Sequence, residues 1–478
     1  MNVVCKKSEL SGRIVVPGSK SHTIRALLLA ALSDGKCKIN NPLPSADGFS
    51  AAHAIKAFGA KVDIGCEVDK KGYPLGKPAS VWFVEGVGEN AHLPNETIDV
   101  GNSGSVLYFF TPVAATFAGT STFTGDESIC KRPVNHLLDA LRQLGCEASV
   151  LYSGVDSPPF SVTGPLRAGK VVTDGTLSQY ISGLMMASCL VEGEIDINLI
   201  EPKETPYLTM TQQWLESVGH KVHISDDFSQ IVATGKHKIV AFDRTIPSDW
   251  EGVAFPAIAA VLSGSDIVVE GVDLSGSQGD DEIVDVLKAL GVPLEIWETD
   301  KNAALGNLHI YGRKVQKMCV LPKDIEKARN ERIEKRGSCS FYEKNGELFI
   351  NLSGWPDAVC ALSVLAAFVD GTVVLEDLGV CRKKETDRLK VMTSELKKLG
   401  VNIEEGEDFL RIVGKGLDGN FEKNVTVESF DDHRVAMSLA CFGWSRVNST
   451  VEVRDAECSN VSFPDFFEKM TRMGAKIR

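Results

Sequence analysis

Four short segments of the chain are rich in residues that bind anions or transfer protons. The first, residues 17–25 (PGSKSHTIR), places a Gly-Ser-Lys-Ser turn directly before an apolar run that is typical of a helix. Backbone N–H groups at a helix start, two hydroxyls and the Lys20 ammonium would converge there on one anion. The glycine spacing differs from that of a nucleotide P-loop. The segment predicts an anion site, although a serine-capped helix with an exposed lysine explains it equally well.

The second segment joins residues 99–105 (DVGNSGS) to residues 125–133 (GDESICKRP). Glycines let a backbone approach a ligand closely, and Arg132 offers a guanidinium that can bind an anion with two hydrogen bonds. Taken alone, a pair of tight turns explains this segment better than a binding site does.

The third and fourth segments, residues 382–388 (RKKETDR) and 431–434 (DDHR), each precede a helical pattern. In the third, Glu385 is flanked by Lys384 and Arg388 within one helical turn, a pattern that a salt-bridged surface helix also shows. In the fourth, His433 stands where a capping histidine that titrates without a catalytic role would also stand. If the fold gathers the cations of all four segments, they attract a polyanionic small molecule; these cations are Lys20, Arg25, Arg132, Lys384, Arg388 and Arg434.

The bulk composition excludes several classes of protein. The chain has 478 residues, a net charge of −13 and a pI near 5.3, which argues against a general nucleic-acid or membrane-surface binder. The N-terminus has no apolar signal sequence, and the longest apolar stretch, residues 358–369, is too short to span a bilayer. The 12 cysteines form no C-x-x-C pair, so neither zinc nor a disulfide framework is expected. We expect a cytoplasmic protein.

The elements that must position these segments follow a repeated pattern. An amphipathic helix, a terminating glycine and a strand recur six times, with the glycines at Gly59, Gly145, Gly219, Gly291, Gly400 and Gly474. Three repeats on each side of residue 245 predict an α/β protein of two similar lobes, residues 1–20 with 246–478 and residues 21–245. We expect the active site in the cleft between them. Extra length falls in residues 298–350, where the charged run 323–336 predicts a solvated helix in an insertion.

The motifs resemble those of the enolpyruvyl transferases, and specifically the 5-enolpyruvylshikimate-3-phosphate (EPSP) synthase family. From residue 17 to residue 467 the matching text is PGSKS, GNSGS, GD-x-S with KRP, SQY, TPY, SQGD, WPDA, KETDR, DDHR and SFPDFF. The sister family that acts on a UDP-sugar has a Lys-Asn pair near its start and a cysteine five residues before the arginine of its Arg-Pro. Here Ser21 follows Lys20 and Glu127 occupies the cysteine position, so the sister family is rejected.

The resemblance implies an inside-out α/β barrel fold in two lobes of three units each. It also implies a transferase reaction in the shikimate pathway of aromatic amino-acid biosynthesis. Phosphoenolpyruvate is protonated at its methylene carbon, a hydroxyl of shikimate 3-phosphate adds to C2, and phosphate leaves. No metal or organic cofactor is implied, the partners are small anionic substrates rather than nucleic acid or membrane, and a monomer is expected.

The resemblance also assigns roles residue by residue. Lys20, Asp357 and Glu385 would transfer protons. Phosphoenolpyruvate would be bound by Lys20, Asn102, Gly104, Arg132, Gln179, Arg388 and Arg434. The acceptor would be bound by Ser21, Arg25, Ser178, Gln179, Glu204, Tyr207, Asp357 and Lys384.

Five positions depart from the family pattern. Tyr108 and Val461 replace an arginine and a lysine, Val380 replaces an asparagine or glutamate, and Leu177 and Glu204 replace two serines that normally hold the acceptor's phosphate. Two alternatives therefore remain: an enolpyruvyl transferase for a different cyclic alcohol, with or without a phosphate, and a catalytically silent homologue that only binds ligand. The retained carboxylates and cations argue against a silent homologue.

Overall fold

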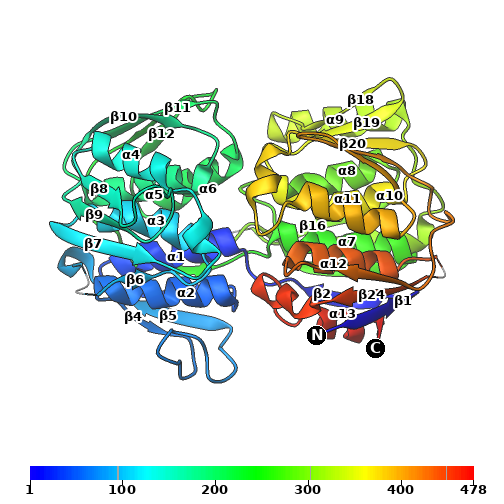
Figure 1. Cartoon of the computed structure of the whole chain (residues 1–478), viewed down its shortest axis with the longest axis horizontal. Helices are drawn as coiled ribbons and strands as arrows, with labels where there is room; N and C mark the ends of the chain where they lie inside the picture. Colours follow the sequence, from blue (N-terminus) through cyan, green and yellow to red (C-terminus); the bar gives the residue numbers. More distant parts are fainter. Residues whose placement is uncertain (94–95, 302, 448) are drawn as a thin grey trace. The chain divides into compact units, whose positions relative to one another are not determined.

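The computed structural model describes residues 1–93, 96–301, 303–447 and 449–478. The chain divides into two compact units: unit 1 comprises Met1–Pro17 and Pro247–Arg478, and unit 2 comprises Gly18–Ile246 (Figure 1). These boundaries lie within three residues of those expected from the repeats. Each unit has its own hydrophobic core.

Unit 2 contains three copies of one arrangement: a buried helix, a second helix and a four-stranded sheet. The first helices are α1 (Lys20–Leu32), α3 (Gly104–Ala114) and α5 (Ser178–Ala187), and the second ones are α2 (Ala46–Ala54), α4 (Asn135–Gln143) and α6 (Thr205–Ser217). One sheet has the order β14 (Asp243–Thr245), β3 (Lys36–Asn40), β5 (Val81–Glu85), β4 (Lys61–Asp63). The second has the order β6 (Ile98–Asp99), β7 (Gly119–Thr124), β9 (Phe160–Gly164), β8 (Glu147–Val150). The third has the order β10 (Gly169–Asp174), β11 (Ile195–Ile200), β13 (Gln230–Ala233), β12 (Val222–Ile224).

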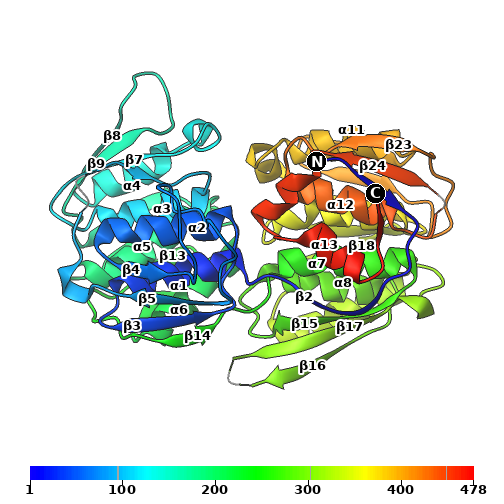
Figure 2. The ribbon, with the colours of Figure 1, turned by 90° about the horizontal axis from the view of Figure 1, so that it is seen from below.

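Unit 1 repeats the same arrangement. Its buried helices are α7 (Trp250–Ser263), α10 (Val359–Ala367) and α12 (His433–Gly443), and its outer helices are α8 (Ile283–Ala289), α11 (Arg388–Lys398) and α13 (Phe466–Arg472). One sheet has the order β16 (Leu294–Asp300), β17 (Leu305–Tyr311), β15 (Asp266–Asp273), β2 (Ser11–Val15). The second has the order β18 (Phe341–Lys344), β19 (Glu347–Asn351), β20 (Thr372–Glu376), β22 (Leu410–Val413), β21 (Asn402–Glu405). The third has the order β23 (Val425–Glu428), β24 (Thr450–Arg454), β1 (Val3–Lys6), β25 (Lys476–Ile477), so both chain ends share one sheet (Figure 2).

The six repeats predicted from the glycines correspond to these six sheets. Each predicted glycine follows its helix with a positive φ, between 81° at Gly291 and 109° at Gly474, a conformation that glycine adopts at no steric cost. Each sheet contains one parallel pair of neighbouring strands, and its other neighbouring pairs are antiparallel. The α/β prediction is confirmed.

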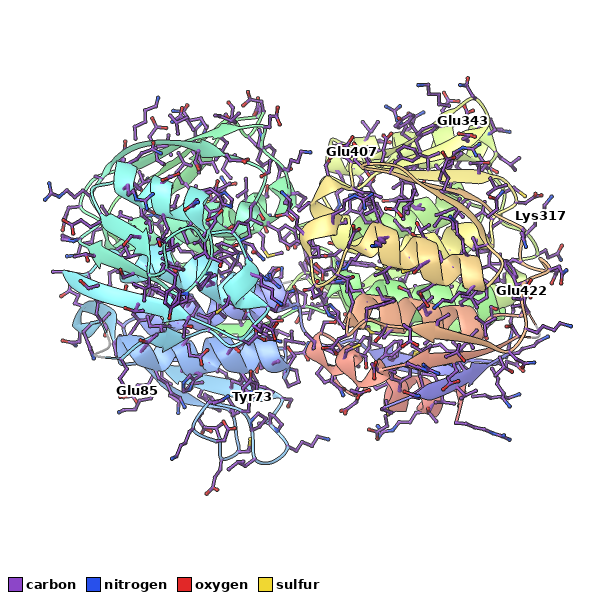
Figure 3. The ribbon with its side chains drawn as sticks, viewed as in Figure 1. Tyr73, Glu85, Lys317, Glu343, Glu407 and Glu422 are labelled. Carbon is purple, nitrogen blue, oxygen red and sulfur yellow. The ribbon has the colours of Figure 1, made fainter. Side chains whose placement is uncertain are left out.

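The insertion adds helix α9 (Pro322–Arg336) and the fifth strand β18 to unit 1. The charged run is helical as predicted, but the expectation that it is solvated is wrong on one face. Arg332 has only 8% of its surface exposed and forms ion pairs with neighbouring carboxylates. Elsewhere charged side chains such as Glu85, Lys317 and Glu422 are exposed on the surface (Figure 3). Among the described helices, none has the length and hydrophobicity that a bilayer-spanning segment needs.

Candidate active site

The predicted residues of unit 2 gather at helix starts. Lys20 and Ser21 begin α1, Gly104 begins α3, Ser178 and Gln179 begin α5, and Glu204 and Tyr207 flank the start of α6. Asn102 precedes α3 by two residues, Arg25 lies one turn into α1, and Arg132 follows a short 3-10 helix, Ile129–Lys131. We call these ten residues the unit 2 cluster. Helix N-termini present unpaired N–H groups and a partial positive charge, which favours anions.

Arg132 and Gln179 connect to the start of α3. A Cβ atom added to Gly104 would lie 2.4 Å from Nη1 of Arg132, so the guanidinium packs directly against this glycine. Gln179 Nε2 donates a hydrogen bond of 3.1 Å to Ser105 Oγ, which joins the starts of α5 and α3. Asn102 Oδ1 is buried and has no hydrogen-bond partner among the described residues. A buried acceptor of this kind can be satisfied by a donor from a ligand.

Arg25 brings Ser21 and Tyr207 together. Its side chain is 1% exposed and donates to Thr211 Oγ1 (2.8 Å), Ser21 O (3.0 Å), Ser182 Oγ (3.1 Å) and Tyr207 O (3.1 Å). Burial lowers the pKa of Arg25 to about 9, with a small opposing effect of Tyr207. All four acceptors are neutral oxygens, so no carboxylate among them balances the guanidinium's positive charge, which suits an anionic ligand.

Two residues of the predicted acceptor set, Glu204 and Ser178, contact each other. Glu204 Oε2 accepts hydrogen bonds from Ser178 N (3.2 Å) and Ser178 Oγ (2.9 Å). The residue is 4% exposed and has a φ of 51°, in the left-handed region. The N-cap residue of α5 is Leu177, which has no polar side chain, so the Glu204 carboxylate caps this helix instead.

The predicted residues of unit 1 form one connected network, which we call the unit 1 cluster. Arg388, fully buried at the start of α11, pairs with Asp357 and, at 2.6 Å, with Glu385. Asp357 Oδ1 also lies 3.7 Å from both Lys384 Nζ and Arg434 Nε. Asp357 is in a 3-10 helix, Pro356–Ala358, before α10, and Arg434 is in the first turn of α12. Three separate helix starts therefore supply two carboxylates and three cations to one place.

Sequence reasoning missed two members of this cluster. Asp432 is fully buried, accepts hydrogen bonds from Arg388 Nε (2.9 Å) and Thr386 Oγ1 (3.0 Å), and caps α12 through Arg434 N (2.9 Å). Burial acts to raise its pKa, but the charge of Arg388 outweighs this and lowers it. Glu251, in the first turn of α7, pairs with Arg434. Asp432 lies in the DDHR segment, whereas no pattern in the sequence pointed to Glu251.

Two of the positions that depart from the family pattern carry no charge in the structure. Tyr108 is 2% exposed, and its hydroxyl donates to Pro133 O at 2.8 Å. Burial raises the pKa of Tyr108 to about 12, so the side chain stays neutral. Val461 ends the 3-10 helix Ala456–Val461. Neither residue replaces the cation that the family pattern has at its position.

His433 is buried and neutral rather than a titrating cap. It is 2% exposed, and burial, followed by the charge of Arg434, lowers its pKa to about 4. The unfolded chain binds a proton near the ordinary histidine pKa of about 6.5, so stability is lost as the pH falls from there towards 4.

We expect the titration of His433 to lower the free energy of unfolding by about 2 kcal/mol when the pH falls from 7 to 5. Urea unfolding at both pH values would measure this. The variant His433→Gln should lose less stability on acidification than the wild type, whereas His223→Gln, at an exposed position, should match the wild type. Equal acid sensitivity of His433→Gln and wild type would contradict a neutral, buried His433.

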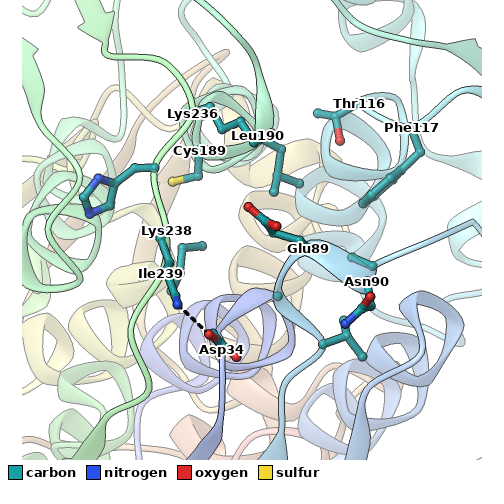
Figure 4. Close-up of a pocket in the computed structure, with 14 residues that line it drawn as sticks. Asp34, Glu89, Asn90, Thr116, Phe117, Cys189, Leu190, Lys236, Lys238 and Ile239 are labelled. Carbon is teal, nitrogen blue, oxygen red and sulfur yellow. Dashed lines mark ion pairs between the residues drawn. The ribbon is translucent and has the colours of Figure 1, made fainter.

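One cavity of unit 2 lies away from these residues. It has a volume of about 410 Å³ and is lined by segments that follow the C-terminal ends of α1, α3 and α5, including Asp34, Phe117 and Leu190 (Figure 4). Lys238 Nζ lies 2.6 Å from Asp34 Oδ2 on its wall. None of the predicted site residues lines it, so it is separate from the candidate site.

Comparisons with known proteins agree with the motifs. Residues 4–470 match the family model of EPSP synthase (3-phosphoshikimate 1-carboxyvinyltransferase). The chain is 34% identical to the 3-phosphoshikimate 1-carboxyvinyltransferase of Acetivibrio thermocellus, over 99% of this chain and 98% of that protein. It is 33% identical to the protein of the same name from Ruminiclostridium cellulolyticum, over 99% and 98% of the two chains. A solved structure of the EPSP synthase from Acinetobacter baumannii matches with a TM-score of 0.79 and 25% identity, covering 100% of this chain and 99% of the other. The chain belongs to the EPSP synthase (3-phosphoshikimate 1-carboxyvinyltransferase) family of transferases.

Proposed function

We propose that the protein transfers the enolpyruvyl group of phosphoenolpyruvate to a hydroxyl of shikimate 3-phosphate and releases phosphate. The observation that carries this proposal is the unit 1 cluster, in which Arg388 holds the carboxylates of both Asp357 and Glu385. A chain of this family with two positioned carboxylates has the groups that a proton-transfer reaction needs. The activity named for its relatives favours the phosphorylated acceptor over the two alternatives.

The proposed reaction needs proton transfer in both directions. One carboxylate accepts the proton of the acceptor hydroxyl while an acid, assisted by Lys20, protonates the methylene carbon. The C–O bond then forms at C2. Loss of a proton from the new methyl group and departure of phosphate from C2 restore the double bond. Arg388 holds Asp357 and Glu385 in place for these steps.

We assign the residues that bind the two substrates by their charge and by their position at helix starts. We assign the charges of phosphoenolpyruvate to Lys20, Arg132, Arg388 and Arg434, because guanidinium and ammonium groups stabilise carboxylate and phosphate. Asn102, Gly104 and Gln179 contribute neutral contacts at helix starts. The acceptor contacts are assigned to Ser21, Arg25, Ser178, Gln179, Glu204, Tyr207, Asp357 and Lys384.

Phosphate release from phosphoenolpyruvate, measured with a panel of acceptors, tests the proposal. Shikimate 3-phosphate should give turnover, and shikimate without phosphate should give far less. Release only with a non-phosphorylated cyclic alcohol, or binding without release, would contradict the proposal. Monomeric state and cytoplasmic location belong to the same proposal, and size-exclusion chromatography and cell fractionation would test them.

Glu204 should weaken the binding of the acceptor's phosphate. Its carboxylate occupies the N–H and hydroxyl of Ser178, so a phosphate seated there meets both competition and charge repulsion. We expect Glu204→Ser combined with Leu177→Ser to raise kcat/KM for shikimate 3-phosphate about tenfold, mainly by lowering KM, because phosphate anchoring is ground-state binding.

Steady-state kinetics with varied acceptor would measure this change, and Glu201→Ser, at a nearby exposed position, is the matched control. No gain in the double variant, together with efficient turnover by the wild type, would show that Glu204 does not oppose the phosphate.

A further inference from the structure

The insertion helix α9 presents one narrow buried face to unit 1. Of its 15 residues, only Ile325, Ala328 and Arg332 are buried, and α9 packs on the neighbouring helix α8. A helix that is so highly charged and has so small an apolar face gains little from hydrophobic burial. Its attachment therefore depends on the buried guanidinium of Arg332.

Arg332 holds three carboxylates at once. Its nitrogens lie 2.9 Å from Asp281 Oδ1, 3.3 Å from Glu282 Oε1 and 2.9 Å from Asp285 Oδ2. Three negative neighbours outweigh burial and raise the pKa of Arg332, so the guanidinium remains charged. Arg332, Asp281 and Glu282 are each at most 8% exposed on their side chains. Removing one partner of so buried an interaction leaves an unpaired charge, which strongly destabilises the fold around it.

Arg336 and Ser340 hold the same loop, residues 276–282. Arg336 Nη2 lies 2.7 Å from Asp281 Oδ2, and its Nη1 would lie 2.1 Å from a Cβ added to Gly276. Ser340 N donates to Glu282 Oε1 at 2.6 Å. Loop 276–282 includes the SQGD motif. Residues of the insertion contact this loop at both of its ends, Gly276 and Glu282.

Loop 276–282 is also tied to the start of α7. Gln278 Oε1 accepts from Trp250 N (2.9 Å), and Gln278 Nε2 donates to Ser248 O (3.1 Å), which ties the loop to the start of α7, where Glu251 lies. Asp280 is 3% exposed, and its Oδ1 has no hydrogen-bond partner among the described residues.

The pKa of Asp280 reports the charges around its carboxyl group. Burial raises this pKa well above its ordinary value, and so do the carboxylates of Glu251, Asp357 and Asp249, while Arg434 opposes them. The carboxyl group of Asp280 therefore shares its surroundings with members of the unit 1 cluster.

We propose that α9 is a brace for the unit 1 cluster, and that Arg332 is a positioning residue for the reaction. By holding Asp281 and Glu282, Arg332 fixes the loop whose Gln278 ties down the first turn of α7, where Glu251 lies. Glu251 in turn pairs with Arg434, so the brace acts on a predicted phosphoenolpyruvate ligand without touching substrate. The activity part of this inference rests on the proposed function, whereas the structural part does not.

Hydrogen exchange of the full chain, measured without substrate, tests the structural part. In Arg332→Ala we expect the amides of residues 275–282 and of Trp250 to exchange at least tenfold faster than in the wild type, because Gln278 no longer holds Trp250 N. Arg329→Ala, on the exposed face of the same helix, should leave these rates within twofold. Unchanged exchange at Trp250 in Arg332→Ala would overturn the brace, whatever the enzyme's activity.

Steady-state kinetics tests the positioning role. We expect kcat/KM for phosphoenolpyruvate to fall by about 10- to 100-fold in Arg332→Ala through both a higher KM and a lower kcat, since small displacements of reacting groups have effects of this size. The acceptor's KM should stay within about threefold. If kcat/KM fell by the same factor for both substrates while both KM values stayed unchanged, the variant would simply contain less folded enzyme. That result would overturn the positioning role of Arg332.

A second variant covers the case in which Arg332→Ala does not fold. Arg336→Ala removes a guanidinium that is 19% exposed and makes one of the loop's ion pairs. Arg336→Ala should also exchange these amides faster and lower kcat/KM for phosphoenolpyruvate, but by smaller factors than Arg332→Ala. Wild-type exchange and kinetics in Arg336→Ala would then overturn the brace. Inactivity of the wild-type protein would contradict the proposed function but leave the exchange result to decide the brace.

Discussion

Glu385→Gln and Asp357→Ala are each expected to lower kcat by about 10²-fold or more, with little change in the fold. Glu385→Gln keeps the size and hydrogen bonding of the side chain but removes the carboxylate that Arg388 holds at 2.6 Å. Asp357→Ala removes the group that Arg388, Lys384 and Arg434 surround. Both losses fall on proton transfer, so they should appear in kcat rather than in stability.

Steady-state phosphate release at saturating substrates would measure these changes, with circular dichroism to verify the fold. Glu404→Gln, on the exposed side of β21 in the same unit, is the matched control and should keep wild-type turnover. Turnover within threefold of wild type in Glu385→Gln or Asp357→Ala would remove that residue from the proton-transfer steps.

Arg388→Ala is expected to have the largest effect on stability, about 3–5 kcal/mol of unfolding free energy at pH 7. Arg388 and Asp432 are both fully buried, so the substitution leaves the Asp432 carboxylate buried without its guanidinium partner. The pairing lowers the pKa of Asp432, so its contribution is present above the ordinary aspartate pKa and is lost as the pH falls. The difference between Arg388→Ala and wild type should therefore shrink at acidic pH.

Urea unfolding of three variants separates the effect of the buried charge from that of an ordinary ion pair. The variants are Arg388→Ala, Arg388→Met with Asp432→Asn, and Arg411→Ala. The double variant removes the unpaired charge and should be more stable than Arg388→Ala. Arg411 pairs with Glu347 at partly exposed positions, and its loss should cost less than about 1 kcal/mol. Similar stabilities of Arg388→Ala and Arg411→Ala would show that the buried pair contributes no more than a surface one.

The repeats and the helix starts could be predicted because they depend on local rules. A glycine with positive φ must end each amphipathic helix, so six similar glycines such as Gly145 and Gly400 marked six units. Polar segments that precede apolar runs had to lie at helix N-termini, and Lys20 and Arg388 do. The ion-pair network around Arg388 in unit 1 could not be read from the sequence.

The remaining features depend on contacts between distant parts of the chain. Arg332 is in a run whose composition indicates a solvated helix, and only its partners Asp281, Glu282 and Asp285 explain its burial. Glu204 departs from the family pattern, but the sequence could not show that its carboxylate caps α5 through Ser178. Local patterns carry no information on such pairs.

The pairing of the N-terminal strands has a consequence for the order of synthesis. Strand β1 pairs with β24 and β25, and β2 pairs with β15, so both strands must wait for partners that the ribosome makes later. Unit 2 is one continuous stretch, Gly18–Ile246, and its partners all emerge before those of unit 1. A growing chain therefore carries a finished unit 2 behind two unpaired strands. Exposed strand edges promote aggregation, so chaperone dependence during translation should arise from strands β1 and β2 rather than from the length of the chain.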